Sequence, residues 1–108
     1  MTQNFDREQL QQLAGGDTAF EKELLRMFVG DTEESLNQLA TAISAQNLGA
    51  VQEIAHYIKG ASANVGAVGM SKTAAQIEMS AKTGNLRSAP RSLKQLQTLY
   101  REVQRLAR

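Results

Sequence analysis

Residues 17–43, DTAFEKELLRMFVGDTEESLNQLATAI, decide the fold class, because their apolar side chains recur at the spacing of one long helix. Asp17 stands where it can cap the first turn. Gly30 costs about 1 kcal/mol relative to alanine, which does not interrupt a repeat of several turns. We therefore expect a long helix whose apolar stripe packs into a helical core. The apolar positions are Phe20, Leu24, Leu25, Phe28, Leu36, Leu39 and Ile43.

The remaining segments also predict helices, and none shows the sustained alternation of polar and apolar residues that is typical of a strand. Asp6 predicts the cap of a short helix that ends at Leu13, before the Gly15-Gly16 pair. After the long helix we expect a turn at Gln46-Asn47 and then three further helices. The first of these ends at about Asn64, and Gly66 and Gly69 follow it. The second runs from about Met70 to Thr83, and the third from Leu86 or Ala89 to Ala107.

Four substantial helices with short connections predict an all-α fold: an antiparallel up-and-down four-helix bundle with a short extra N-terminal helix. A chain of 108 residues is long enough for one hydrophobic core, so we expect a single domain over residues 1–108. Within it, residues 1–16 are expected to form the N-terminal helix and turn, and residues 17–107 the helical bundle.

The composition favours a globular protein and argues against several kinds of site. Apolar residues make up 42% of the chain and charged residues 21%. There is no cysteine and only one histidine, so we expect neither a disulfide framework nor a bound metal. No apolar run approaches the roughly 20 residues of a membrane span, and no signal peptide is visible. We therefore expect a cytoplasmic protein without a membrane partner, and we take it to be a monomer.

The single histidine, His56, lies in the segment Ala55–Ala67, AHYIKGASANVGA. If a helix turns about 100° per residue, His56 lies roughly opposite the apolar stripe that contains Val51 and Ile58. The imidazole is therefore expected at the surface rather than in the core. A solvated surface histidine without a function is the alternative that periodicity leaves open.

The neighbours of His56 favour a site that carries a phosphoryl group. Lys59, one helical turn later, can hold its ammonium near an anion on the imidazole. Gly60 lowers helix stability by about 1 kcal/mol, but it leaves a hollow through which a large partner can approach. A chance glycine and a solvated lysine are the alternative interpretation. The residues on the same arc that are expected to meet the partner are Gln52, Ala63 and Ala67.

No motif in the sequence would bind a nucleotide. The chain has neither the phosphate-binding loop G-x-x-x-x-G-K-[ST] nor the signature set of protein kinases. We therefore expect a protein that can carry a phosphoryl group but does not take it from ATP unaided.

The segment from His56 to Ala67 resembles the signature of histidine-containing phosphotransfer (HPt) domains. That signature is a histidine, an apolar residue two positions on, Lys-Gly, small residues and an apolar-Gly-Ala ending. Two downstream segments extend the resemblance, Gln76-Ile77-Glu78 and Thr83-Gly84-Asn85-Leu86. In the second segment, Asn85 replaces the aspartate that is usual in the family. The resemblance covers most of residues 17–108, with the N-terminal half matching mainly in its helical pattern.

The resemblance implies a phosphorelay intermediate of two-component signal transduction rather than an enzyme. His56 would accept a phosphoryl group through Nε2 from a receiver-domain aspartate or a kinase, and would pass it to a receiver aspartate. Lys59 would steady the phosphoryl oxygens, and Gly60 would admit the receiver. Glu78 matches a position that lies near the histidine in relatives and would orient it. A glutamate at the edge of the core is the alternative for Glu78.

The implied partners are receiver domains of response regulators and of hybrid histidine kinases. The chain itself would need no cofactor, because Mg²⁺ would belong to the receiver. On the helix that follows, Met79 is expected to point outward and to help form the receiver-docking surface. The residues of the inward stripe on this helix are Met70, Ala74, Ile77 and Ala81.

The last predicted helix suggests a different class of function, a non-catalytic scaffold or adaptor. Its basic side chains all lie within about 60° of Arg87 around the helix, so the helix could contact nucleic acid or an anionic surface. This face has no aromatic or asparagine to stack on bases or read them, and such a stripe is usually a solvated face. We therefore expect no nucleic-acid partner. The basic residues are Arg87, Arg91, Lys94, Arg101, Arg105 and Arg108.

Overall fold

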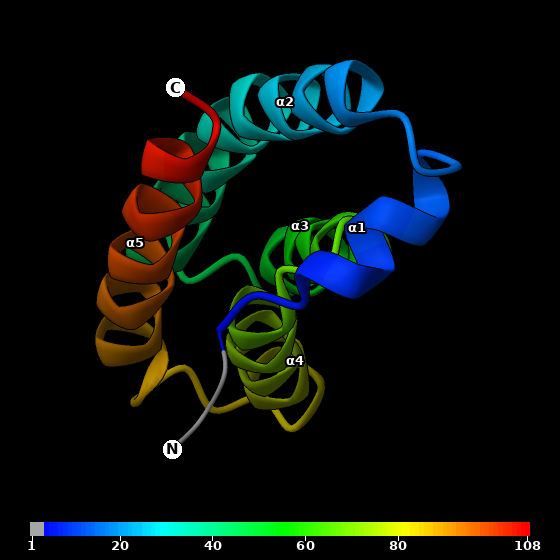
Figure 1. The fold of residues 1–108 in the computed structure, drawn as a ribbon. Helices are drawn as coiled ribbons and strands as arrows, with labels where there is room; N and C mark the ends of the chain where they lie inside the picture. Colours follow the sequence, from blue (N-terminus) through cyan, green and yellow to red (C-terminus); the bar gives the residue numbers. More distant parts are fainter. Residues whose placement is uncertain (1–3) are drawn as a thin grey trace.

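A computed structural model of the protein describes residues 4–108, and the five helices found there confirm the predicted all-α class (Figure 1). None of the described residues forms a strand. Residues 1–3, which belong to the predicted N-terminal segment, lie outside this range. Within it, no helix is both long and apolar enough to span a membrane. The helices are α1 (Arg7–Leu13), α2 (Thr18–Ser44), α3 (Leu48–Asn64), α4 (Val68–Lys82) and α5 (Ala89–Leu106).

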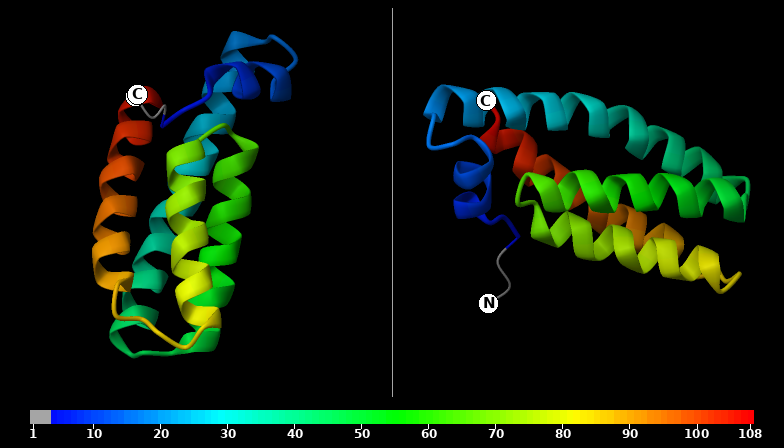
Figure 2. Two further views of the ribbon diagram at one scale, coloured as in Figure 1. Left: turned by 90° about the horizontal axis from the view of Figure 1, so that it is seen from below. Right: turned by 90° about the vertical axis from the view of Figure 1, so that its right-hand side faces the viewer.

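Helices α2 to α5 form a four-helix bundle in which consecutive helices run in opposite directions (Figure 2). Each helix packs against two neighbours: α2 and α4 each contact both α3 and α5. The pair α3 and α4 is the most extensively packed. Helix α1 lies at one end of the bundle, where it contacts α2 and α3. The arrangement is the predicted up-and-down bundle with an extra N-terminal helix.

Side-chain caps start the first three helices, as the sequence predicts for α1 and α2. Asp6, Asp17 and Asn47 each accept a hydrogen bond from the backbone N–H three residues later. Such a bond satisfies a donor that has no partner within the helix and is worth about 1 kcal/mol. Helix α5 instead has Pro90 in its first turn, where the missing N–H removes no helical hydrogen bond.

The turn between α3 and α4 is shorter than the sequence suggests. Helix α4 begins at Val68 rather than near Met70, so Gly69 lies in its first turn and does not help to end α3. Gly66 reverses the chain, with a φ of +84° that only glycine adopts at little cost. The two long helices that carry the candidate site are therefore joined by a very short connection.

The core of the bundle is mostly aliphatic, with Phe28 and Tyr100 as buried aromatic side chains, and it contains most of the predicted apolar stripes. Leu39, Ile58, Ile77 and Leu96 are completely buried. Phe20 is the exception, because its side chain is 46% exposed although the stripe of α2 predicted it to be buried. Phe20 belongs to the first turn of α2, and the first turns of this helix run past the ends of α3 and α4 (Figure 2).

The segment before α1 is held against the turn between α3 and α4. The backbone N–H of Asp6 donates to the Gly66 carbonyl at 2.6 Å, and the N–H of Gly69 donates to the Asn4 carbonyl at 3.1 Å. A Cβ added at Gly66 would overlap the carbonyl group of Asp6. The side-chain amide of Gln9 in α1 also donates to the Ala63 carbonyl near the end of α3. These contacts fix the end of the α3–α4 pair.

We expect Gly66→Ala to lower the free energy of unfolding by about 2 kcal/mol or more, because it adds left-handed backbone strain to a steric clash with Asp6. Urea-induced unfolding measures this change. Gly30→Ala is the matched control, since Gly30 lies inside α2 with open space around it and should gain up to about 1 kcal/mol. A Gly66→Ala protein as stable as the wild type would contradict the close approach.

Candidate functional site

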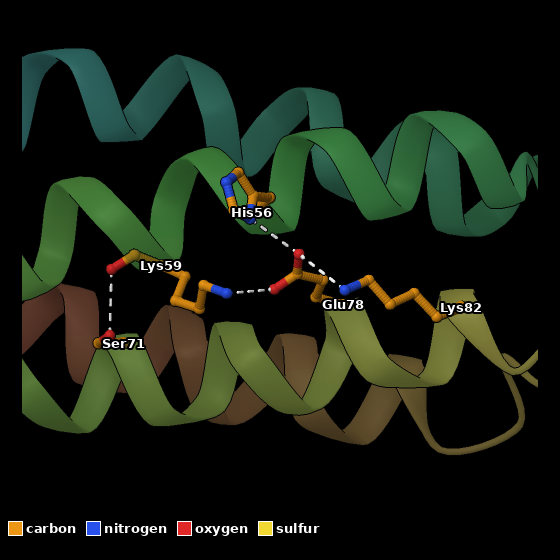
Figure 3. Close-up of polar contacts among 5 residues, drawn as sticks. All are labelled: His56, Lys59, Ser71, Glu78 and Lys82. Carbon is orange, nitrogen blue, oxygen red and sulfur yellow. Dashed lines mark hydrogen bonds and ion pairs between the residues drawn. The ribbon is translucent and has the colours of Figure 1, made fainter.

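His56 lies on the solvent side of α3, as its helical phase predicts. Its side chain is 67% exposed, whereas Val51, Ala55 and Ile58 on the same helix are completely buried. The buried residues face the other helices of the bundle, and the imidazole stands on the face formed by α3 and α4 (Figure 3). The ring can therefore be reached by another macromolecule without any opening of the core.

Glu78 of α4 holds the imidazole from one side. Its Oε2 lies 2.8 Å from Nδ1 of His56, and its Oε1 accepts a hydrogen bond from Nζ of Lys59 at 2.7 Å (Figure 3). Glu78 itself is only 5% exposed. The close packing of α3 and α4 makes this bridge, and it is reinforced where the Ser71 hydroxyl donates to the Lys59 carbonyl at 3.0 Å. Glu78 is thus a bridging residue rather than only a glutamate at the core edge.

The pKa of Glu78 is lowered from its ordinary value of 4.5. The hydrogen bond from Lys59 is the largest cause; burial acts in the opposite direction, and the hydrogen bond from His56 lowers the pKa further. The carboxylate is therefore ionised at neutral pH and can only accept hydrogen bonds. It follows that Nδ1 of His56 carries a hydrogen, and that Nε2 of a neutral ring keeps its lone pair.

A second lysine at the site was missed by the sequence analysis. Nζ of Lys82 lies 3.8 Å from Oε2 of Glu78, one helical turn away on the same helix. The signal was present in the sequence, since glutamate followed by lysine four residues later is a favourable helical pair. It carried no weight because the resemblance implied a place near His56 for Glu78 but not for the residue one turn after it. The carboxylate lies between Lys59 and Lys82, with His56 above it (Figure 3).

All but one of the residues that were predicted to meet a partner around His56 are at least partly exposed to solvent. Gly60 is exposed, and a Cβ added there would meet no neighbouring atom within 4 Å. Ala63 is also exposed, Gln52 is partly exposed, and Met79 points outward with 58% of its surface accessible. These residues are accessible to a partner on α3 and α4.

The prediction for Ala67 was wrong, because this residue is completely buried. Helix α3 ends at Asn64 and the chain reverses at Gly66, so the helical arc of His56 does not extend to residue 67. Ala67 instead precedes α4, and its N–H donates to the Ser62 carbonyl at 2.8 Å. It packs inside the turn and cannot contact a partner.

No three His, Cys, Asp or Glu side chains gather into a metal-binding group within residues 4–108. The only histidine is bonded to a carboxylate that is shared with lysine. The expectation that the chain needs no metal or cofactor of its own stays a prediction.

Comparisons with known proteins agree with this fold and identify the family. The family model described as Hpt domain matches residues 23–106. The crystal structure of histidine-containing phosphotransfer protein B (HptB) from Pseudomonas aeruginosa PAO1 is similar over 99% of this chain and 93% of its own, with 32% identity and a TM-score of 0.91.

A second solved structure, the HPT domain of a sensor hybrid histidine kinase from Shewanella, is 17% identical. It aligns with 95% of this chain and 92% of its own, with a TM-score of 0.74, and supports the fold alone. Among curated protein sequences, none matches the chain significantly.

Acid should remove the stabilising contribution of Glu78. Because its folded-state pKa is lowered, this contribution is fully present above the ordinary value of 4.5 and is lost as the pH falls through the folded-state pKa. Near neutral pH we expect Glu78→Gln to lower the free energy of unfolding by about 1 kcal/mol. The difference in the free energy of unfolding between the variant and the wild type should become smaller below pH 4.5 in urea-unfolding measurements. A difference that is constant with pH would contradict an ionised, paired carboxylate.

Proposed function

Because the chain belongs to the Hpt domain family, we propose that it is the histidine phosphocarrier of a phosphorelay, with His56 as the phosphorylated residue. The protein accepts a phosphoryl group from an aspartate of a receiver domain, or from a kinase, and passes it to a receiver aspartate. The observation that carries the proposal is the 2.8 Å bond between Nδ1 of His56 and Glu78, on a ring that is 67% exposed.

The transfer step follows from the state of the ring. The Nε2 lone pair attacks the phosphorus of the aspartyl phosphate, an N–P bond forms, and the P–O bond to the aspartate breaks to release its carboxylate. Nδ1 keeps its hydrogen throughout, so the ring gains positive charge as the N–P bond forms. Glu78 faces Nδ1 and stabilises that charge, and the reverse sequence returns the phosphoryl group to a receiver.

Lys59 has two roles in this proposal. One N–H of its ammonium is bonded to Glu78, which keeps the carboxylate ionised and in place. A lysine has three N–H donors, so the other two can reach an oxygen of the phosphoryl group. Phosphoryl transfer passes through a loose transition state in which positioning and cations supply most of the catalysis. Mg²⁺ is supplied by the receiver and not by this chain.

The partners are receiver domains of response regulators or of hybrid histidine kinases, which dock on the face of α3 and α4. The docking surface around the imidazole consists of Gln52, Gly60, Ala63 and Met79. Because Gly60 has no side chain, it does not block the approach of a partner to the ring. The protein acts as a cytoplasmic monomer without kinase activity of its own. The basic side chains of α5 lie on a helix that does not contact α3, and this function does not use them.

Incubation with a panel of phosphorylated receiver domains tests the assignment of His56. We expect an acid-labile, base-stable label on the wild type and none on His56→Gln, because glutamine has no nucleophilic nitrogen. Unchanged helical content of the variant by circular dichroism is the control for folding. Equal labelling of the variant and the wild type would rule out His56 as the acceptor.

The Gly60→Ala variant tests whether the glycine serves partner access rather than helix stability. We expect the variant to be more stable by up to about 1 kcal/mol, because alanine is the better helix former and its Cβ meets no atom of the protein. Phosphotransfer from a receiver should nevertheless be about ten-fold slower, since the added methyl group stands where the receiver approaches. Gly30→Ala is the control: it should gain similar stability and keep the wild-type transfer rate.

A further inference from the structure

We propose that the outer face of α5 binds the surface of an anionic phospholipid bilayer through a row of basic side chains. The phosphocarrier function does not use these side chains, so the two proposals stand independently. The expectation of no membrane partner came from the absence of a spanning segment, and contact through the surface of a folded helix needs no such segment. This basic face consists of Arg91, Lys94, Arg101 and Arg105 within α5, with Arg87 and Arg108 just outside its two ends.

The four helical members of the basic face form one row along α5. At about 100° per residue they lie within an arc of about 80° around the helix. At a rise of about 1.5 Å per residue, the row from Arg91 to Arg105 is about 21 Å long. All six basic residues are exposed. The row can therefore lie against one surface with all its cationic groups directed toward it.

No acidic side chain within residues 4–108 forms an ion pair with the basic face, since every ion pair in that range involves Glu78. Glu102, the only acidic residue of α5, accepts a hydrogen bond from the Asn4 side chain at 3.3 Å. Glu33 of α2 lines a hollow together with Arg101 but is not paired with it. The positive charge of the face therefore stays available to an external anion.

The shape of the row favours a flat anionic surface over nucleic acid. The phosphates of duplex DNA lie along both sides of a groove, so a helix in the major groove needs cations on both its flanks to reach them. The basic face has a single row, and the one aromatic residue of α5, Tyr100, is buried and cannot stack on the bases of a single strand. A bilayer presents phosphates over a plane, where guanidinium groups can bind their oxygens bidentately.

The contact is electrostatic, because the inward side chains of α5 are not free to insert into lipid. Leu96, Leu99 and Val103 are buried against the other helices. Helix α5 packs on α2 and α4 and does not contact α3, so the basic face points away from the helix that carries His56 (Figure 1). A bilayer that lies against α5 therefore leaves the imidazole accessible.

Sedimentation of the whole protein with lipid vesicles tests this binding. At low ionic strength we expect the wild type to bind vesicles of phosphatidylcholine and phosphatidylglycerol in equal parts, but not vesicles of phosphatidylcholine alone. Binding should weaken when added salt shortens the Debye length from about 30 Å to about 8 Å. The triple variant Arg91→Gln, Lys94→Gln, Arg101→Gln should bind about a hundred-fold more weakly, because each basic side chain near an anionic leaflet contributes about five-fold.

The matched control removes the same charge from other helices, through Arg7→Gln, Lys22→Gln and Lys72→Gln. It should bind within a few-fold of the wild type. All six substituted side chains are exposed, so both triple variants should keep the helical content of the wild type by circular dichroism.

Three outcomes would overturn the inference. The first is a wild type that does not bind the anionic vesicles or binds both kinds of vesicle alike. The second is equal weakening of the two triple variants, which would assign the binding to net charge rather than to the basic face. The third is tighter binding of the wild type to duplex DNA than to the anionic vesicles, which would assign the face to nucleic acid. Phosphoryl labelling of His56 is measured separately and is affected by none of these outcomes.

Discussion

The carboxylate of Glu78 is the constraint on which the site depends. It is buried between α3 and α4, and a buried carboxylate is tolerated only where cations and hydrogen bonds replace its hydration. Lys59 and the ring of His56 provide these partners from α3. One group therefore links the two helices, fixes which nitrogen of the imidazole carries the hydrogen, and leaves the other nitrogen available. In the proposed mechanism it also faces the charge that appears on the ring.

This bridge needs two helices that are held in a fixed relation to each other. Helices α3 and α4 make the most extensive contact of the bundle, and Gly66 joins them through a turn that leaves no room for a side chain. The segment before α1 is hydrogen-bonded across that turn, and α2 and α5 complete the core behind the pair. The candidate site thus lies on a rigid surface, which favours a reaction that depends on positioning.

The solvent-exposed face of α3 and α4 contains a glycine that the packing of the helices does not require. Gly60 lies in the middle of α3 with no atom of the protein above it, so neither packing nor backbone geometry requires a glycine there. Alanine would make a more stable helix. The conflict between local helix stability and the residue present is typical of a functional position, and it agrees with the proposed approach of a receiver domain to this face.

The sequence by itself determined the fold class, the helix boundaries to within a few residues, and the exposure of His56. All three depend on local rules, namely the period of the apolar residues, the capping side chains and the direction of each residue around a helix. The same rules misplaced Phe20 and Ala67. In the first case the long helix runs past its neighbours, and in the second the helical arc was continued beyond the end of the helix.

Only the tertiary structure decided how the polar groups meet. Glu78 and Lys82 lie more than a dozen residues beyond Lys59 in the sequence, and no periodicity within one helix specifies which residue of the neighbouring helix lies opposite His56. That register is set by the packing of α3 on α4 and by the short turn at Gly66. The sequence alone thus pointed to His56 as the candidate residue. The resemblance named Lys59 and Glu78 as further candidates, but only the folded bundle shows that Glu78 contacts His56, Lys59 and Lys82 together, because helix-to-helix contacts are made by side chains distant in the chain.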